Sequence, residues 1–320
     1  MKENDRNVIV TGAAGFIGSH ICERLIREGC RVIGIDSFTD YYSPARKRVH
    51  LESIISEPRF SLIEEDLNSC DMAELAEGAS CIFHLAAQAG VRKSWGKDFS
   101  CYVDSNVSAT QKILEAVKDM KGTRIVYSSS SSVYGETDEL PMKEDDRVKP
   151  VSPYGVTKLS GENLCELYRF NFGMDIVSLR YFTVYGPRQR PDMAFSKFIT
   201  SAIRGGRIEI FGDGNQTRDF TFISDAVEAN LLAMKYQGDV SIFNIGGGSR
   251  SSILRVLDII REVSGRELNI DFMSRAKGDV TDTWADTSRA RQELGFQPEV
   301  TLEDGIRREY QWYLDYRETE

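Results

Sequence analysis

The chain has 320 residues, of which 41% are hydrophobic and 28% charged, and its formal net charge is -9 at pH 7. This length exceeds that of a typical single-core domain, so we expect two lobes, or one large α/β domain with a smaller one attached. The negative balance, with both signs mixed along the chain, argues against nucleic acid or an anionic membrane surface as a partner. An anionic ligand would need local basic residues.

The start of the chain, residues 1–6, is polar and leads directly into an apolar run. We expect no signal peptide from such a start, and no apolar stretch approaches the roughly 18 residues of a membrane span. The sequence therefore predicts a soluble, cytoplasmic protein. Its six cysteines form no C-x-x-C pair and its three histidines are far apart, so neither a disulfide framework nor a metal site is expected.

The first informative segment is an apolar run at 7–11, followed by Gly12-Ala13-Ala14-Gly15-Phe16-Ile17-Gly18 and a helical pattern. This order predicts a strand, a tight glycine loop and a helix. Glycine lets the backbone approach a pyrophosphate, which the free N–H groups of a helix N-terminus attract. Glycines alone are weak evidence, because turns and close packing also require them.

A second apolar run at 31–35 ends in Asp36. A carboxylate at this point can accept both hydroxyls of an adenosine ribose and would repel a 2'-phosphate, so NAD is preferred over NADP. Further strands at 60–64 and 81–85, with helices between them, predict an α/β fold with a Rossmann-type, doubly wound parallel sheet. We expect the loops after these strands to line the cofactor cleft, although the segment 84–88 is equally compatible with plain packing.

Residues 37–48 combine an aromatic stretch with basic residues, between the second and third strands. In a nucleic-acid-binding protein such a cluster could be a contact loop. In an acidic chain a solvated insertion is the more common interpretation, and we expect that here.

Five serines at 128–132 follow an apolar run at 124–127. Each hydroxyl needs a hydrogen-bond partner if it is buried, so the serines predict a polar active-site floor. Further on, Tyr154 and Lys158 open a helix and share one of its faces. A nearby cation lowers the pKa of a phenol from about 10, but a single exposed pair is too weak to bring it near neutrality. Additional positive charge, such as an oxidised nicotinamide, would be needed, and a chance pairing on a surface helix is the alternative.

Together these features resemble the extended short-chain dehydrogenase/reductase family, in its nucleotide-sugar epimerase and dehydratase branch. The glycine loop, Asp36, H-L-A-A, S-S-S-x-x-V-Y-G and Y-x-x-x-K appear in the family's order within residues 7–185. The resemblance implies three catalytic residues: Ser130 to hydrogen-bond the reacting sugar oxygen, Tyr154 as the base, and Lys158 to hold the nicotinamide ribose and depress the tyrosine pKa. It also implies that NAD is bound by Gly12, Gly15, Phe16, Ile17, Gly18, Asp36, Asp66, Leu67, Leu85, Ala86, Ala87, Asn106, Ser128, Tyr154 and Lys158.

The residues after Ser130 separate the reaction types of this branch. Dehydratases and decarboxylating relatives carry carboxylates where this chain has Ser131 and Ser132. Without a carboxylate for elimination, 4-epimerisation remains, through transient oxidation at C4 and return of the hydride to the opposite face of the sugar. Glucose-type epimerases usually have asparagine where Thr183 stands, and the segment 182–195 is similar to UDP-glucuronate 4-epimerases.

The resemblance therefore implies conversion of UDP-glucuronate to UDP-galacturonate, with serine and threonine hydroxyls holding the sugar carboxylate. Two alternatives stay open: a UDP-glucose or UDP-N-acetylglucosamine 4-epimerase, and a non-catalytic nucleotide-sensing protein of the same fold. Arg190 is expected near the carboxylate, or paired with Asp192, and Arg218 is expected on the diphosphate, or paired with Asp219. The full set of expected substrate-binding residues is Arg92, Ser130, Ser131, Ser132, Thr183, Arg190, Phe211, Arg218, Arg275 and Asp279.

The sequence also predicts how the chain is divided and assembled. Residues 1–189 are expected to form the NAD-binding domain, with later segments returning to it, and residues 190–320 mainly the nucleotide-sugar-binding lobe. Relatives commonly form homodimers through helices that correspond to residues 101–118 and 154–172, so we expect a homodimer here.

Overall fold

The computed structural model describes residues 6–248 and 250–317. Residues 1–5, on which the expectation of no signal peptide largely rests, lie outside the described residues. The strands are β1 (Asn7–Thr11), β2 (Arg31–Ile35), β3 (Phe60–Ile63), β4 (Cys81–His84), β5 (Arg124–Ser130), β6 (Asp175–Tyr181), β7 (Thr183–Tyr185), β8 (Arg207–Phe211), β9 (Thr217–Phe222), β10 (Ile242–Ile245), β11 (Arg250–Ser252) and β12 (Asn269–Met273). The α-helices are α1 (Phe16–Arg27), α2 (Pro44–Val49), α3 (Met72–Leu75), α4 (Phe99–Val103), α5 (Ala109–Val117), α6 (Pro153–Phe172), α7 (Ala194–Arg204), α8 (Ile223–Lys235), α9 (Ile253–Ser264) and α10 (Leu302–Arg317).

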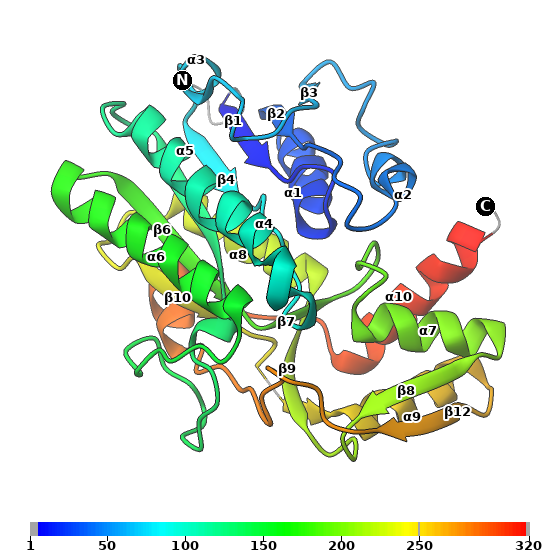
Figure 1. Ribbon diagram of the computed structural model, residues 1–320. Helices are drawn as coiled ribbons and strands as arrows, with labels where there is room; N and C mark the ends of the chain where they lie inside the picture. The colour runs from blue at the N-terminus through cyan, green and yellow to red at the C-terminus, as the bar shows by residue number, and fades with distance from the viewer. Residues whose placement is uncertain (1–5, 249, 318–320) are drawn as a thin grey trace.

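The larger of the sheets is parallel throughout, with the strand order β10-β6-β5-β4-β1-β2-β3. This order is that of a doubly wound Rossmann fold, so the predicted fold class is confirmed. The strands are apolar on both faces because helices cover both faces. Ile9, Ile82 and Ile125 pack under α5 and α6, whereas Val8 and Val10 point to the other side. Figure 1 shows α5 and α6 lying beside each other along one face of the sheet.

The order of the strands predicts where a ligand binds. β1 pairs with both β2 and β4. The strands β2 and β3 extend the sheet to one side of β1, and β4, β5 and β6 extend it to the other. Ligands of open α/β sheets bind at the carboxyl ends of the strands, at such a reversal. The loops after β1, β2 and β4 therefore form the expected cofactor edge.

The second half of the chain contributes to both parts of the molecule. β10 joins the edge of the large sheet beside β6, and the remaining strands form two small sheets, β11-β9-β7 and β12-β8. Figure 1 shows β8, β12, α7, α9 and α10 gathered at one end of the molecule, below the cofactor edge of the large sheet. The chain enters this part directly after β6, where β7 begins.

A buried ion pair lies behind the serine-rich end of β5. The Arg180 guanidinium donates to both carboxylate oxygens of Glu162, at 2.6 and 3.0 Å. Both side chains are at most 4% exposed. Ser129 donates to the same carboxylate at 2.5 Å, and Arg180 also donates to the Tyr134 hydroxyl at 2.8 Å. Because every charge in this cluster has a partner, the cluster fixes β5, β6 and α6 relative to one another.

We expect Arg180→Leu to lower the free energy of unfolding by about 3–5 kcal/mol, because it leaves the Glu162 carboxylate buried and unpaired. Urea unfolding followed by circular dichroism measures this loss. The double variant Arg180→Leu/Glu162→Met removes both charges and is expected to recover most of the loss. If the double variant is as unstable as the single one, the burial of an unpaired charge is not the cause.

Candidate active site

Two adjoining cavities lie at the carboxyl ends of the strands, with volumes of about 440 and 800 Å³. The smaller one, here called the cofactor cavity, is lined by the glycine loop, the end of β2 and the serines of β5. The larger one, the substrate cavity, lies between the large sheet and α7 and β8. The two share the residues Tyr41, Gly90, Val91, Thr183, Arg190 and Met193. A ligand in one cavity can therefore meet a ligand in the other.

At Gly12 and Gly18 the glycine loop has no room for a side chain. Gly12 has a φ of +70°, and a Cβ there would lie 2.9 Å from the Ala86 amide nitrogen. A Cβ on Gly18 would lie 2.1 Å from the Gly12 carbonyl oxygen. The loop therefore brings bare backbone and the N-terminus of α1 to the cavity wall, which suits the pyrophosphate of a dinucleotide.

Asp36 ends β2 at the wall of the cofactor cavity. Its carboxylate accepts the Ala14 N–H at 3.1 Å and the Phe38 N–H at 2.8 Å, and it lies 3.8 Å from the ammonium of Lys47. These contacts fix the carboxylate where a ribose would lie, so the structure fits the adenosine half of NAD. Glycine-loop residues and the later predicted contacts Asp66, Leu67, Leu85, Ala86, Ala87 and Ser128 line the same cavity.

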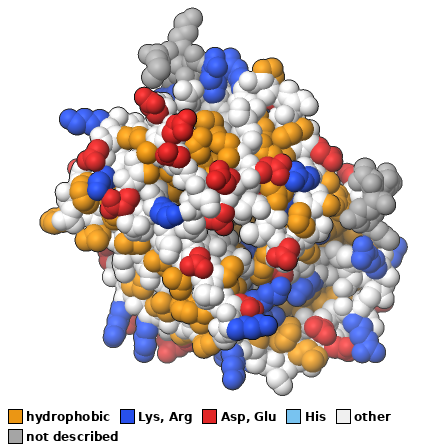
Figure 2. All heavy atoms as spheres, turned by 45° about the horizontal axis from the view of Figure 1, so that its top comes forward, with side chains coloured by type: hydrophobic (Ala, Val, Ile, Leu, Met, Phe, Trp, Pro, Cys, Tyr) orange, Lys and Arg blue, Asp and Glu red, His pale blue; other side chains and the backbone are white. Residues whose placement is uncertain are grey.

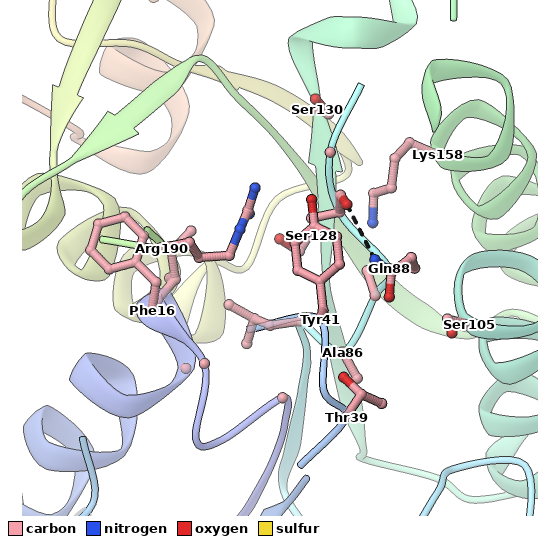
Figure 3. Close-up of a pocket in the computed structure, with 18 of the residues that line it drawn as sticks. Phe16, Thr39, Tyr41, Ala86, Gln88, Ser105, Ser128, Ser130, Lys158 and Arg190 are labelled. Carbon is pink, nitrogen blue, oxygen red and sulfur yellow. Dashed lines mark hydrogen bonds between the residues drawn. The ribbon is translucent and has the colours of Figure 1, made fainter. Parts of the chain in front are cut away.

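The segment 37–48 is only in part the solvated insertion that the sequence predicts: most of its residues are exposed, but some of its side chains turn inward. Tyr41, Tyr42 and Lys47 line the cofactor cavity, and Lys47 is buried against Asp36 and the ring of Tyr42. Tyr41 is a cavity residue that the sequence analysis missed. No local signal could have identified it, because its position depends on how the loop folds back across the sheet. Figure 3 shows its ring standing inside the cavity, between Lys158 and Arg190.

The three predicted catalytic residues come together in the cofactor cavity. Ser152 caps α6 by accepting the Gly155 N–H at 3.1 Å, which places Tyr154 in the first turn. A Cβ on Gly155 would lie 2.5 Å from the Ser132 carbonyl oxygen, so glycine lets α6 press against the serine run. Figure 3 shows Lys158 reaching from α6 toward the same space that Ser128 and Ser130 border.

The protonation of Tyr154 reflects two opposing effects. Burial raises its pKa above the ordinary value of 10, while the positive charge of Arg190 and a hydrogen bond from Ser130 lower it. The ammonium of Lys158 lies 4.5 Å from the centre of the Tyr127 ring, and burial lowers the pKa of Lys158 to about 8. Both expected roles of Lys158, holding a ribose and depressing the Tyr154 pKa, stay predictions.

Arg190 pairs with Asp192, one of the two positions expected for it, and it also lines the wall between the two cavities. Its guanidinium donates to both carboxylate oxygens of Asp192, at 3.0 and 3.1 Å, and it lines both cavities. Asp192 also accepts the Tyr41 hydroxyl at 3.2 Å. The pair with Asp192 thus aims Arg190 at the shared wall instead of withdrawing it.

The predicted contacts in the substrate cavity fall into two groups. In the first group, Arg92 contacts both Asp279 and Phe211. Its guanidinium lies 2.7 Å from a carboxylate oxygen of Asp279 and 4.0 Å from the centre of the Phe211 ring. Arg218 also lines this cavity, but it donates to the carbonyl oxygens of Thr217, Val280 and Thr281. An ion pair between Arg218 and Asp219, the other possibility, is not found among the described residues.

Two predicted contacts lie outside both cavities. Arg275 is exposed and pairs with Glu136 at 3.2 Å. Asn106 is buried behind the cofactor cavity, where its side chain accepts the Gln88 N–H at 2.7 Å and donates to the Gln88 carbonyl at 3.0 Å. Its contact is with the wall of the cavity and not with the cavity itself.

Among the described residues, no three His, Cys, Asp or Glu side chains are arranged to hold a metal ion. In the same part of the chain no helix is both long and apolar enough to cross a bilayer. In the view of Figure 2, one group of Lys and Arg side chains lies toward the lower right, and the other charged side chains, of both signs, are scattered.

Comparison with known proteins shows the chain's relationships. Residues 8–246 match the NAD dependent epimerase/dehydratase family. The chain is 45% identical to the uncharacterized UDP-glucose epimerase YtcB of Bacillus subtilis, over 94% of this chain and 96% of that protein. It is 38% identical to the UDP-glucuronate 4-epimerase of Thermodesulfobacterium geofontis, over 95% of each. A crystal structure of UDP-glucuronic acid 4-epimerase from Bacillus cereus, in complex with UDP-glucuronic acid and NAD, matches with a TM-score of 0.94 and 43% identity, covering 97% of this chain and 99% of that one.

We expect Arg190→Met to raise the pKa of Tyr154, because it removes the cation that opposes the effect of burial. The ultraviolet difference spectrum between each protein and its Tyr154→Phe counterpart isolates the ionisation of this one phenol. Arg92→Met is the matched control, since Arg92 pairs with Asp279 and does not act on Tyr154. An unchanged pKa in Arg190→Met would contradict the assignment.

Proposed function

The chain belongs to the NAD dependent epimerase/dehydratase family, and we propose that it interconverts UDP-glucuronate and UDP-galacturonate by 4-epimerisation. The observation that carries this proposal is the set of side chains around Tyr154. Ser131, Ser132 and Thr183 line the cofactor cavity beside it, whereas the acidic residues that line this cavity are Asp36, Glu65 and Asp66, at its adenosine end. Next to Tyr154 the cofactor cavity therefore offers hydroxyls to a sugar carboxylate. In the adjoining substrate cavity, the Asp192 carboxylate is bound by Arg190 and the Asp279 carboxylate by Arg92, so neither is a free base for elimination.

The named relatives support this substrate and also supply the alternative. The proteins from T. geofontis and B. cereus are named for UDP-glucuronate, and the latter matches almost the full length of this chain. The protein from B. subtilis is named for UDP-glucose. Thr183, standing where glucose-type epimerases usually have asparagine, favours the hexuronate.

The chain's own residues can carry out the proton transfer. In the proposed reaction Ser130 hydrogen-bonds the C4 oxygen of the sugar, and Tyr154 accepts its proton and later returns it. Arg190 favours the phenolate during this exchange. NAD, when bound by the glycine loop, Asp36 and Lys158, supplies the hydride acceptor and donor at C4.

The hydroxyls also bear on the outcome of the reaction. A ketone at C4 of a glucuronate is β to the carboxylate, which is lost as CO2 when it stands perpendicular to the carbonyl. Hydrogen bonds from Ser131, Ser132 and Thr183 can hold the carboxylate away from that orientation. We therefore propose that these hydroxyls select the hexuronate and suppress its decarboxylation.

We expect the purified protein to convert UDP-glucuronate to UDP-galacturonate, with little conversion of UDP-glucose or UDP-N-acetylglucosamine. Products are separated by chromatography after incubation with each sugar. Turnover of the neutral sugars alone would overturn the hexuronate assignment. A UDP-pentose product would show that decarboxylation is not suppressed.

The variant Tyr154→Phe is the control for this experiment, because it removes the base while keeping the shape of the ring. It is expected to bind NAD and to lose turnover by a factor of at least about 100. Near-normal turnover would exclude Tyr154 as the base.

We further propose that the protein acts as a homodimer in the cytoplasm, with residues 1–189 as the NAD-binding domain and 190–320 mainly as the substrate lobe. The apolar side chains Val156, Leu167 and Phe170 are exposed on one side of α6, and Phe170 is 87% exposed. An apolar face of this kind favours a symmetric contact with a second copy. The six free cysteines agree with a reducing compartment.

We expect Leu167→Glu/Phe170→Glu to shift the protein from dimer to monomer, because it places charges in the proposed contact. Light scattering during size-exclusion chromatography measures the mass. Phe272→Glu changes another exposed phenylalanine, on β12, and is expected to leave the mass unchanged. A wild-type protein that is monomeric at all concentrations would contradict the proposal.

A further inference from the structure

His84 ends β4 directly before the segment 85–88 that lines the cofactor cavity. Its side chain is 2% exposed and does not line the cavity itself. Both ring nitrogens have partners: Nδ1 lies 2.9 Å from the Thr11 hydroxyl and Nε2 lies 3.0 Å from the Thr110 hydroxyl. Both polar atoms of this buried ring are therefore satisfied within the protein.

The Thr11 hydroxyl determines which nitrogen of His84 carries the proton. Its oxygen accepts two backbone N–H groups, those of Leu85 and Ala86, each at 3.1 Å. A hydroxyl has two lone pairs and one proton, so both lone pairs are used and the proton remains for His84. Nδ1 is therefore the acceptor, and the proton of the neutral ring is on Nε2. Burial agrees with a neutral ring, since it lowers the pKa of His84 to about 3.

The chain of hydrogen bonds continues from Nε2 toward α6. The Nε2–H group donates to Thr110, whose hydroxyl donates to the Asn106 carbonyl at 2.8 Å. The Asn106 side chain holds the backbone of Gln88 through two bonds and donates to the Thr157 hydroxyl at 2.9 Å. Thr157 in turn donates to a backbone carbonyl in the first turn of α6, that of Tyr154, at 2.9 Å.

We propose that Thr11, His84, Thr110, Asn106 and Thr157 form one directional hydrogen-bond chain that positions the 85–88 wall of the cofactor cavity relative to the Tyr154 helix. The two backbone N–H groups that Thr11 accepts assign its own proton and the proton of His84, so this half of the chain runs in one direction. The whole chain ties the strand before the glycine loop to the first turn of the catalytic helix. These are positioning residues, because they do not line the substrate cavity.

The first test is the tautomer of His84, which does not depend on the proposed function. The chain has three histidines, so a protein labelled with ¹⁵N-histidine gives three ring patterns, and His84→Gln assigns the one of interest. Two-bond ¹H–¹⁵N correlation spectra are expected to show His84 neutral, with the proton on Nε2. A proton on Nδ1, or exchange between the two forms, would overturn the chain.

The second test is kinetic and rests on the proposed function. Thr110→Val removes the hydroxyl at almost constant shape, whereas Thr110→Ser keeps it. We expect kcat to fall by at least about tenfold in Thr110→Val, with KM for the UDP-sugar within about twofold, because a small misplacement of the base slows the reaction without removing substrate contacts. Thr110→Ser is expected to recover most of kcat.

A matched control separates positioning from general destabilisation. Thr123 is also a buried threonine that donates to a backbone carbonyl, that of Ala79 at 2.8 Å, but it precedes β5 at the opposite end of the sheet. Thr123→Val is expected to lose a similar amount of stability and to keep kcat. Equal losses of kcat in Thr110→Val and Thr123→Val, or none in Thr110→Val, would overturn the positioning role. A wild type with the expected tautomer but no turnover of UDP-sugars would instead count against the proposed function alone.

Discussion

The partial burial of Tyr154 in the wall of the cofactor cavity is the physical constraint on which the rest of the site depends. Removing a phenol from water disfavours its charged form, and this effect alone would make it a poor base. Arg190 and Ser130 both lower the pKa of the phenol, one by its positive charge and the other by a hydrogen bond. Arg190 can do so only because Asp192 holds its guanidinium at the cavity wall. Tyr154, Arg190 and Asp192 thus form one electrostatic unit.

The serine run shows how one strand end serves two environments. The Ser129 hydroxyl points to the buried carboxylate of Glu162, which Arg180 neutralises. Ser130, the next residue, points to the opposite face and borders the cavity, as the alternation along a strand requires. The buried charges therefore fix the strand from behind, and the front is left free to bind a ligand. Glycine at position 155 completes the arrangement by letting α6 approach the same strand end.

Much of the fold and of the cofactor site could be predicted because their signals are local. The strand, glycine loop and helix at 7–27, the acidic end of β2 and the spacing of Tyr154 and Lys158 each act within a few residues. Tyr41 and Asn106 could not be assigned in this way, since one depends on how a loop folds back and the other on packing between α6 and the segment 85–88. Arg218 lines the substrate cavity, so its contact with a phosphate stays a prediction. Its hydrogen bonds to Val280 and Thr281 could not be predicted, because these residues are about sixty positions further along the chain.

The boundary between the two cavities explains how specificity can vary while the cofactor site stays the same. Thr183 and Arg190 follow β6, where the chain leaves the large sheet for the small ones, and both line the two cavities. The glycine loop and Asp36 lie on β1 and β2, across the central reversal of the sheet. A substitution at 183 therefore changes what the sugar meets without touching the residues that fit the dinucleotide. The same separation lets a family keep one redox cofactor and act on different sugars, because the cofactor depends on backbone geometry and the sugar on a few side chains at the shared wall.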